Sequence, residues 1–154
     1  MLKLLWFILI ISQFTPHKAE APYARQAYLP IAGDRIDISV ADQIRIVARQ
    51  ECNKKDLGRY CEDDLMAMAW TESRFNVNAI GDNGASQGLY QIHLGYHPEI
   101  TQAQARDIEF STKWTLNRLI AYGYPVYRSY AVMKHNGTPN TPNTLAYLSR
   151  VNNY

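Results

Sequence analysis

The chain has 154 residues, of which 47% are hydrophobic and 19% are charged, and its formal net charge is +2. This length corresponds to one domain, and the apolar fraction is enough to bury a core, which excludes a disordered chain. The small net charge and the scattered Lys and Arg residues exclude nucleic acid as a partner.

The first residues have the pattern of an export signal. Lys3 precedes an unbroken apolar run over 4–11, and Ala19-Glu20-Ala21 is a small-x-small cleavage pattern. The run is too short to span a bilayer, which needs about 20 apolar residues. We therefore predict a signal peptide over 1–21 and an exported protein, periplasmic or extracellular. Retention as an uncleaved anchor is the alternative, because Pro22 would follow the cut.

Helical periodicity organises the rest of the chain. Residues 22–38 show no sustained period, so we predict a linker or extended arm there, followed by one domain over 39–154. No strand pattern of any length follows. The predicted fold is all-α, with about six helices. The first runs from Ser39 to about Cys52, the second begins near Glu62, a short third is capped by Thr101, and the fourth covers 110–122. The fifth covers 126–136, with Pro125 in its first turn and Tyr127, Tyr130 and Ala131 inward, and after a loop over 138–143 the sixth is marked by Leu145, Leu148 and Val151.

Cys52 and Cys61 are the only cysteines. In an exported protein such a pair predicts a disulfide, which would stabilise a short loop by roughly 2–3 kcal/mol. Two free core thiols or a partial metal site are the alternatives. No His lies near the pair in sequence, so we expect no metal.

Glu72 is the candidate acid. It follows Leu65 by seven residues and therefore lies on the apolar face of its helix, near the C-terminal end. Partial burial and the negative end of the helix dipole would both raise its pKa, as a general acid requires. An ordinary surface salt bridge between Glu72 and Arg74 is the alternative.

A stretch rich in Asn and Gly follows Glu72 over 76–88, and it predicts turns that either line a cleft or merely connect helices. His93 and His97 come next in another irregular stretch. No third ligand has suitable spacing, so we expect solvated or hydrogen-bonded histidines and no metal site.

Four short motifs together resemble one family. In chain order they are Glu72-Ser73, the segment 84–92 ending in Gly-Leu-Tyr-Gln-Ile, the His-Asn-Gly at 135–137, and the Tyr-Leu-Ser-Arg-Val at 147–151. This order and spacing is similar to the lytic transglycosylase SLT domain, a lysozyme-like fold related to goose-type lysozyme. The resemblance covers roughly residues 40–154.

The resemblance implies a set of site residues. Glu72 would be catalytic, and Ser73, Gln91 and Asn136 would contact substrate. Two positions depart from the family, because Tyr90 stands where Met is usual and His135 stands where Tyr is usual. Both positions face the cleft in the family, so Tyr90 and His135 are expected to contact substrate as well.

The function implied by the resemblance is cleavage of the β-1,4 bond from N-acetylmuramic acid to N-acetylglucosamine in peptidoglycan glycan strands. Glu72 would act first as acid and then as base, forming a 1,6-anhydro sugar without metal or organic cofactor. The expected protein is a monomer, whose partners could include a secretion apparatus or a phage particle. The alternatives are a lysozyme-type hydrolase that uses Asp82 or another acid, and a non-catalytic wall-binding or assembly protein.

Overall fold

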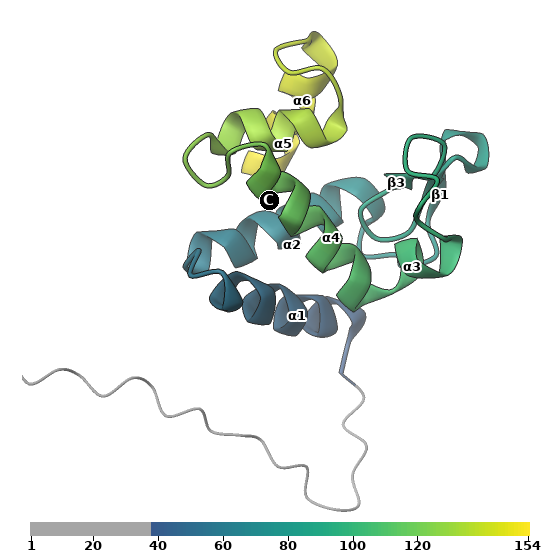
Figure 1. Cartoon of the computed structure of the whole chain (residues 1–154), viewed down its shortest axis with the longest axis horizontal. Coiled ribbons are helices and arrows are strands. Elements are labelled where there is room, and N and C mark those ends of the chain that lie inside the picture. Colours follow the sequence, from purple (N-terminus) through teal and green to yellow (C-terminus); the bar gives the residue numbers. More distant parts are fainter. Residues whose placement is uncertain (1–37) are drawn as a thin grey trace, which may run out of the picture. The chain divides into compact units, whose positions relative to one another are not determined.

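A computed structural model describes residues 38–154, so the predicted signal peptide over 1–21 and all but the last residue of the arm over 22–38 lie outside the described residues. The described part is mostly helical (Figure 1). Its elements are α1 (Val40–Lys54), α2 (Arg59–Ser73), β1 (Ile80–Gly81), a short 3-10 helix (Asp82–Gly84), β2 (Ser86–Gln87), β3 (Ile92–His93), α3 (Gln102–Arg106), α4 (Ile108–Ala121), α5 (Arg128–Asn136) and α6 (Pro142–Asn152). None of the described helices is both long and apolar enough to cross a membrane.

The prediction of a mostly helical fold with six helices is confirmed over these residues, but the prediction of no strands is wrong. Three two-residue strands form an antiparallel sheet in the order β1-β2-β3, in which Ile80 pairs with Gln87 and Gln87 pairs with Ile92. Strands this short contain no full period of alternating apolar residues, which is why periodicity did not reveal them.

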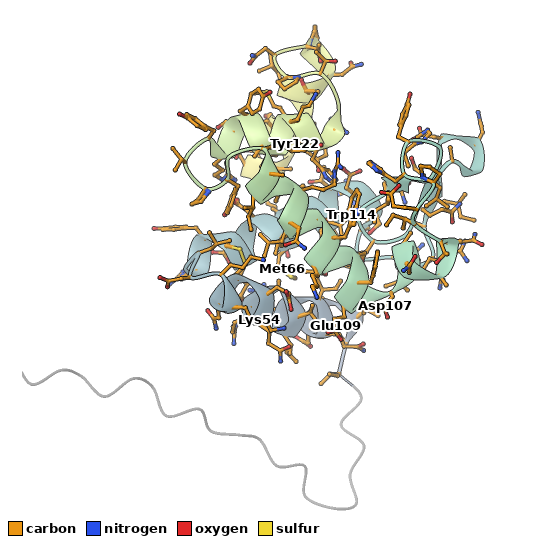
Figure 2. All side chains as sticks on the ribbon, in the orientation of Figure 1. Lys54, Met66, Asp107, Glu109, Trp114 and Tyr122 are labelled. Atoms are coloured by element: carbon orange, nitrogen blue, oxygen red, sulfur yellow. A yellow bond between two sulfur atoms is a disulfide. The ribbon has the colours of Figure 1, made fainter. Side chains whose placement is uncertain are left out.

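The core lies between α1, α2, α4, α5 and α6. α1 packs against α2 and α4, while α6 packs against α2 and α5. Met66 of α2 is 1% exposed and points between the helices, whereas the labelled Lys54 and Glu109 lie at the surface (Figure 2). A second, smaller apolar cluster of Ile92, Ile100 and Ala105 joins the sheet region to α3.

The disulfide between Cys52 and Cys61 is confirmed, with Cα atoms 5.9 Å apart. It joins the last turns of α1 to the first turn of α2. Glu62 lies beside it and accepts hydrogen bonds from Arg45 (3.1 Å) and Arg49 (2.9 Å) of α1. These links join the first turn of α2 to α1. The helix α2 begins at Arg59, earlier than the predicted start near Glu62.

Two predicted boundaries near prolines are wrong. Tyr124 and Pro125 are joined by a cis peptide bond in a turn, and α5 begins only at Arg128. Pro142, which we assigned to a loop, instead occupies the first turn of α6, where Thr141 and Thr144 form a capping box. A proline fits the first turn of a helix, because an N–H at that position would have no partner in the helix. We expected Pro125 to take such a position, whereas Pro142 is the proline that occupies one.

The predicted apolar faces of the last two helices are each confirmed only in part. In α5 the buried residues are Ala131, Val132 and Met133, whereas Tyr127 and Tyr130 are exposed. In α6, Val151 is buried and Leu148 packs against the core as expected, whereas Leu145 is exposed and Tyr147 is buried instead. Each helix is short and each face contains few apolar residues, so spacing alone left its rotation undetermined.

Candidate active site

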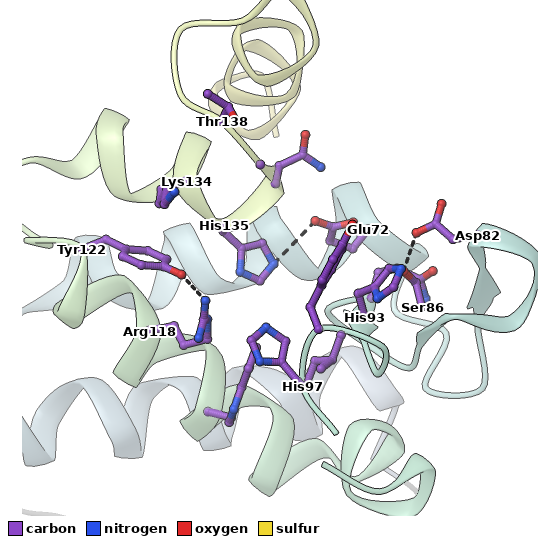
Figure 3. A pocket seen from close by; sticks show the side chains of 16 residues that line it. Glu72, Asp82, Ser86, His93, His97, Arg118, Tyr122, Lys134, His135 and Thr138 are labelled. Carbon is purple, nitrogen blue, oxygen red and sulfur yellow. Dashed lines mark hydrogen bonds and ion pairs between the residues drawn. The ribbon is translucent and has the colours of Figure 1, made fainter. Parts of the chain in front are cut away.

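A pocket of about 720 Å³ opens where α2, the small sheet, α4 and α5 meet (Figure 3). The side chains that line it are mostly polar, with three aromatic rings among them. They are Glu72, Asp82, Ser86, Gln91, Ile92, His93, Tyr96, His97, Trp114, Arg118, Tyr122, Lys134, His135, Asn136 and Thr138, together with Gly137.

Glu72 reaches this pocket from the end of α2. The helix ends at Ser73 because Arg74 and Phe75 adopt positive φ angles of 54° and 63°, which turn the chain away from the helix. The side chain of Glu72 is 14% exposed. It therefore faces the pocket while it remains largely enclosed by protein.

Burial raises the pKa of Glu72 to about 7. The charge of Asp82 adds to the rise, whereas the Tyr147 hydroxyl and the Arg150 charge partly oppose it. The Tyr147 hydroxyl faces the carboxyl without reaching hydrogen-bond geometry. The pKa of Glu72 is thus raised, which is the predicted direction, and desolvation is the main cause.

The alternative of a Glu72–Arg74 salt bridge is wrong. The guanidinium of Arg74 lies 4.7 Å from the centre of the Trp70 ring, in a cation–π contact, and Glu72 has a different neighbour. That neighbour is His135, whose Nε2 lies 3.6 Å from Oε1 of Glu72.

His135 is uncharged at neutral pH. Its pKa is lowered to about 4, chiefly by burial and in smaller part by the charge of Arg118, while a hydrogen bond with the backbone of Tyr90 opposes the change. An imidazolium beside Glu72 would favour the carboxylate and lower its pKa. A neutral imidazole does not, so the contact between His135 and Glu72 is compatible with a protonated acid.

Gln91 and Asn136 also line the pocket. Gln91 has a positive φ of 48°, and its Nε2 donates to the carbonyl oxygens of Gly88 (2.9 Å) and Ala79 (3.3 Å). Asn136 is exposed at the last turn of α5. The structure therefore brings four of the predicted residues, Glu72, Gln91, His135 and Asn136, around one cavity.

Ser73 and Tyr90 are not among the lining residues. Ser73 Oγ donates to the carbonyl oxygen of Ala69 (3.1 Å), one turn back in α2. Tyr90 is 0% exposed and belongs to the main core, so its ring cannot lie against a sugar in this structure. Positive φ angles at Gly88 and Gln91 surround Tyr90 and turn its side chain inward.

Gly88 has a further structural role. A Cβ at this position would lie 1.9 Å from the carbonyl oxygen of Ala105, so only glycine lets the loop pack this closely against α3. This contact fixes the segment that carries Gln91.

Several further residues line the pocket, and of these only Asp82 was considered for a catalytic role from the sequence, as the second acid of a hydrolase. Asp82 accepts a hydrogen bond from Ser86 Oγ at the edge of the sheet. His93 stacks on Tyr96 with ring centres 4.2 Å apart, and His97 packs edge-on against Trp114 at 4.8 Å. Both histidines thus pack against aromatic rings of the pocket wall. His97 Nδ1 also lies 3.4 Å from Oε1 of Glu99, whereas the buried Nδ1 of His93 has no hydrogen-bond partner among the described residues. No cluster of three potential metal ligands occurs in residues 38–154.

For only one group of these residues did the sequence contain a pattern that could have placed them together. Trp114, Arg118 and Tyr122 are spaced by four and therefore share one face of α4. Nothing in the sequence indicated that this face would point into the pocket.

No family model, no curated protein and no solved structure matches this chain.

Proposed function

We propose that the protein is a lytic transglycosylase that cleaves the bond from N-acetylmuramic acid to N-acetylglucosamine in peptidoglycan. The observation that carries the proposal is a single buried carboxyl, Glu72, that faces an open polar pocket and has its pKa raised to about 7. Such a group holds a proton near neutral pH and can both donate and recover it.

In the first step Glu72 donates its proton to the glycosidic oxygen while the bond from that oxygen to the anomeric carbon breaks. The N-acetyl oxygen of the muramic acid stabilises the positive charge that develops at this carbon. In the second step the C6 hydroxyl of the same sugar attacks the anomeric carbon and returns its proton to Glu72. A 1,6-anhydro sugar results, Glu72 is regenerated, and no water is consumed.

The neighbours of Glu72 support this cycle. Neutral His135 and the Tyr147 hydroxyl surround the carboxyl without providing a positive charge in direct contact with it. Arg150 acts only as a charge that partly opposes the rise of the pKa. With its pKa at about 7, Glu72 is protonated in an appreciable fraction of molecules at neutral pH and can donate to the substrate.

Export would bring the protein to its substrate, because peptidoglycan lies outside the cytoplasmic membrane. The disulfide between Cys52 and Cys61 is compatible with an oxidising compartment. We propose glycan strands as the partner, with a secretion apparatus or a phage particle as the larger assembly.

Lysozyme-type hydrolysis of the same bond is the second candidate, and one observation favours it. Asp82 lines the same pocket as Glu72, and its charge contributes to the raised pKa of Glu72. A hydrolase needs a second carboxylate as nucleophile or as base for water. Asp82 is the group available for that role.

The products of a peptidoglycan digest distinguish these functions. The full chain is incubated with purified peptidoglycan, and the released muropeptides are weighed by mass spectrometry. We expect products ending in 1,6-anhydro sugars, each lighter by one water than a hydrolysis product. Reducing-end products would establish the hydrolase instead, and binding to the wall without any product would establish a non-catalytic protein.

Substitution of Asp82 tests its role independently. In a transglycosylase Asp82→Asn should change the rate by less than about tenfold, because it removes only a charge that makes a minor contribution to the raised pKa of Glu72. In a hydrolase the same change should reduce the rate by about 10²–10⁴-fold, since the base for water is lost. The rate of muropeptide release measures the difference, and Asp63→Asn at the exposed start of α2 is the matched control.

A further inference from the structure

One wall of the pocket carries a positively charged side chain that the proposed reaction does not use. Arg118 of α4 is partly buried between the rings of Trp114 and Tyr122, with its guanidinium carbon 5.0 Å and 5.1 Å from their centres. Nη2 of Arg118 donates a hydrogen bond to the Tyr122 hydroxyl. Two rings and one hydrogen bond therefore hold the guanidinium in a defined position.

Arg118 has no acidic partner within residues 38–154. The ion pairs of that part of the chain involve Arg45, Arg49, Lys54, Arg128 and two histidines, and none involves Arg118. Among the described residues, the Arg118 side chain donates a hydrogen bond only to Tyr122. The remaining N–H groups of the guanidinium are thus free to bind a ligand.

The charges of the pocket are separated. Glu72 and Asp82 lie on one side of Figure 3, whereas Arg118 and the exposed Lys134 lie on the other, with His135 between them. His97 and His135 both have lowered pKa values, mainly because of burial and in part because of the charge of Arg118. Arg118 therefore provides a fixed positive charge some distance from the acid.

We propose that Arg118 binds a carboxylate of the glycan substrate, on the lactyl group or peptide stem carried by muramic acid. This inference rests on the proposed function. N-acetylglucosamine and N-acetylmuramic acid rings are themselves uncharged, and the negative charge of a peptidoglycan strand lies on these substituents. A guanidinium presents parallel N–H donors that match a carboxylate, and the flanking rings fix their direction.

Binding to three soluble saccharides of equal sugar number tests the proposal. They are strands with peptide stems, strands from which an amidase has removed the stems to leave the lactyl carboxylate, and neutral N-acetylglucosamine oligomers. The full chain carries Glu72→Gln to prevent turnover, and calorimetry compares it with the same chain carrying Arg118→Gln in addition. Lys113→Gln, on the exposed face of α4, is the matched control for loss of charge.

We expect Arg118→Gln to weaken binding of a carboxylate-bearing strand about tenfold, and to change binding of the neutral oligomer less than about twofold. The loss should shrink at high salt, because ion pairs are screened. A loss confined to stem-bearing strands assigns the carboxylate to the peptide, and a loss confined to stripped strands assigns it to the lactyl group. Equal losses on both assign a site that accepts either carboxylate. Lys113→Gln should leave all three affinities unchanged.

Three results would overturn the site. One is an equal loss on the neutral oligomer, which would mean that Arg118 supports the fold or contacts the sugar rings. The second is no loss on either charged strand, and the third is no binding of any saccharide by the Glu72→Gln chain. Cleavage tests the proposed function separately. If Arg118→Gln weakens binding as expected but the unsubstituted chain cleaves nothing, the proposed function is overturned and the Arg118 site is not.

Discussion

The Glu72→Gln variant is expected to release muropeptides about 10²–10⁴-fold more slowly than the unsubstituted chain, because the amide can neither donate the proton nor recover it. Gln has nearly the same shape as a protonated Glu, so the pocket should stay intact. The initial rate of release from purified peptidoglycan measures the effect. Glu109→Gln, exposed on α4 and outside the pocket, is the control. A Glu72→Gln chain with the unsubstituted rate would remove Glu72 from the mechanism.

The pH dependence of the same rate follows from the same group. Glu72 must be protonated to begin the cycle, and its pKa is raised to about 7. We therefore expect the rate to fall as pH rises through about 7, since the fraction of protonated Glu72 falls there. A rate that rises through this range would show that the group acts first as a base.

Glu72→Gln should also stabilise the fold at alkaline pH. The ordinary pKa of Glu72 is 4.5 and its folded value is about 7, so the unfolded chain loses the proton first as pH rises. Below pH 4.5 the protonated carboxyl makes its full contribution to the free energy of unfolding. This contribution is lost progressively as pH rises to about 7 and beyond. This rise of the pKa corresponds to about 3 kcal/mol, so the variant should gain up to that amount at about pH 8 and little below about pH 5.

Urea unfolding at these two pH values measures the gain. The combination of lost activity and increased stability distinguishes an active-site acid from a structural Glu, whose removal would lower stability. Equal stability of the two chains at both pH values would contradict a buried Glu72 with a raised pKa.

The second large effect is expected at Asp64, a carboxylate of α2 that is 6% exposed. It accepts hydrogen bonds from the Tyr124 hydroxyl (2.8 Å) and from Nε of Arg128 (2.8 Å), and so ties α2 to the turn before α5 and to α5 itself. Asp64→Ala should lower the free energy of unfolding by about 3 kcal/mol, because removal of one partner leaves a partly buried charge uncompensated. Arg128 is 34% exposed, so the expected loss lies at the lower end of the roughly 3–5 kcal/mol typical of a broken buried ion pair.

Asp63→Ala is the matched control for Asp64→Ala. Asp63 is the preceding residue on the same helix, and it is exposed. Its removal should change the free energy of unfolding by less than about 0.5 kcal/mol. Similar values for the two variants, measured by urea unfolding at neutral pH, would show that the Asp64–Arg128 pair does not hold the two helices together.

Local patterns were enough to predict much of this fold. Ser39 accepts a hydrogen bond from the N–H of Asp42 at the start of α1, and Thr101 and Gln104 form the expected capping box of α3. These capping contacts join residues within four positions of one another, so the local sequence is enough to predict them. The pairing of Cys52 with Cys61 followed from there being only two cysteines. The orientation of Glu72 followed from helical spacing, since seven residues separate it from Leu65.

Long-range packing decided the rest of the site. Tyr90 enters the core and leaves the pocket because of positive φ angles at Gly88 and Gln91, and the packing of Gly88 against Ala105 holds that conformation. Arg118 faces the pocket only because α4 packs against α1 and α5 with this rotation. The raised pKa of Glu72 likewise depends on groups from α5 and α6 that enclose it. The sequence by itself therefore determined the helices, the disulfide and the candidate acid, whereas contacts between distant segments determined which side chains surround that acid and how strongly they desolvate it.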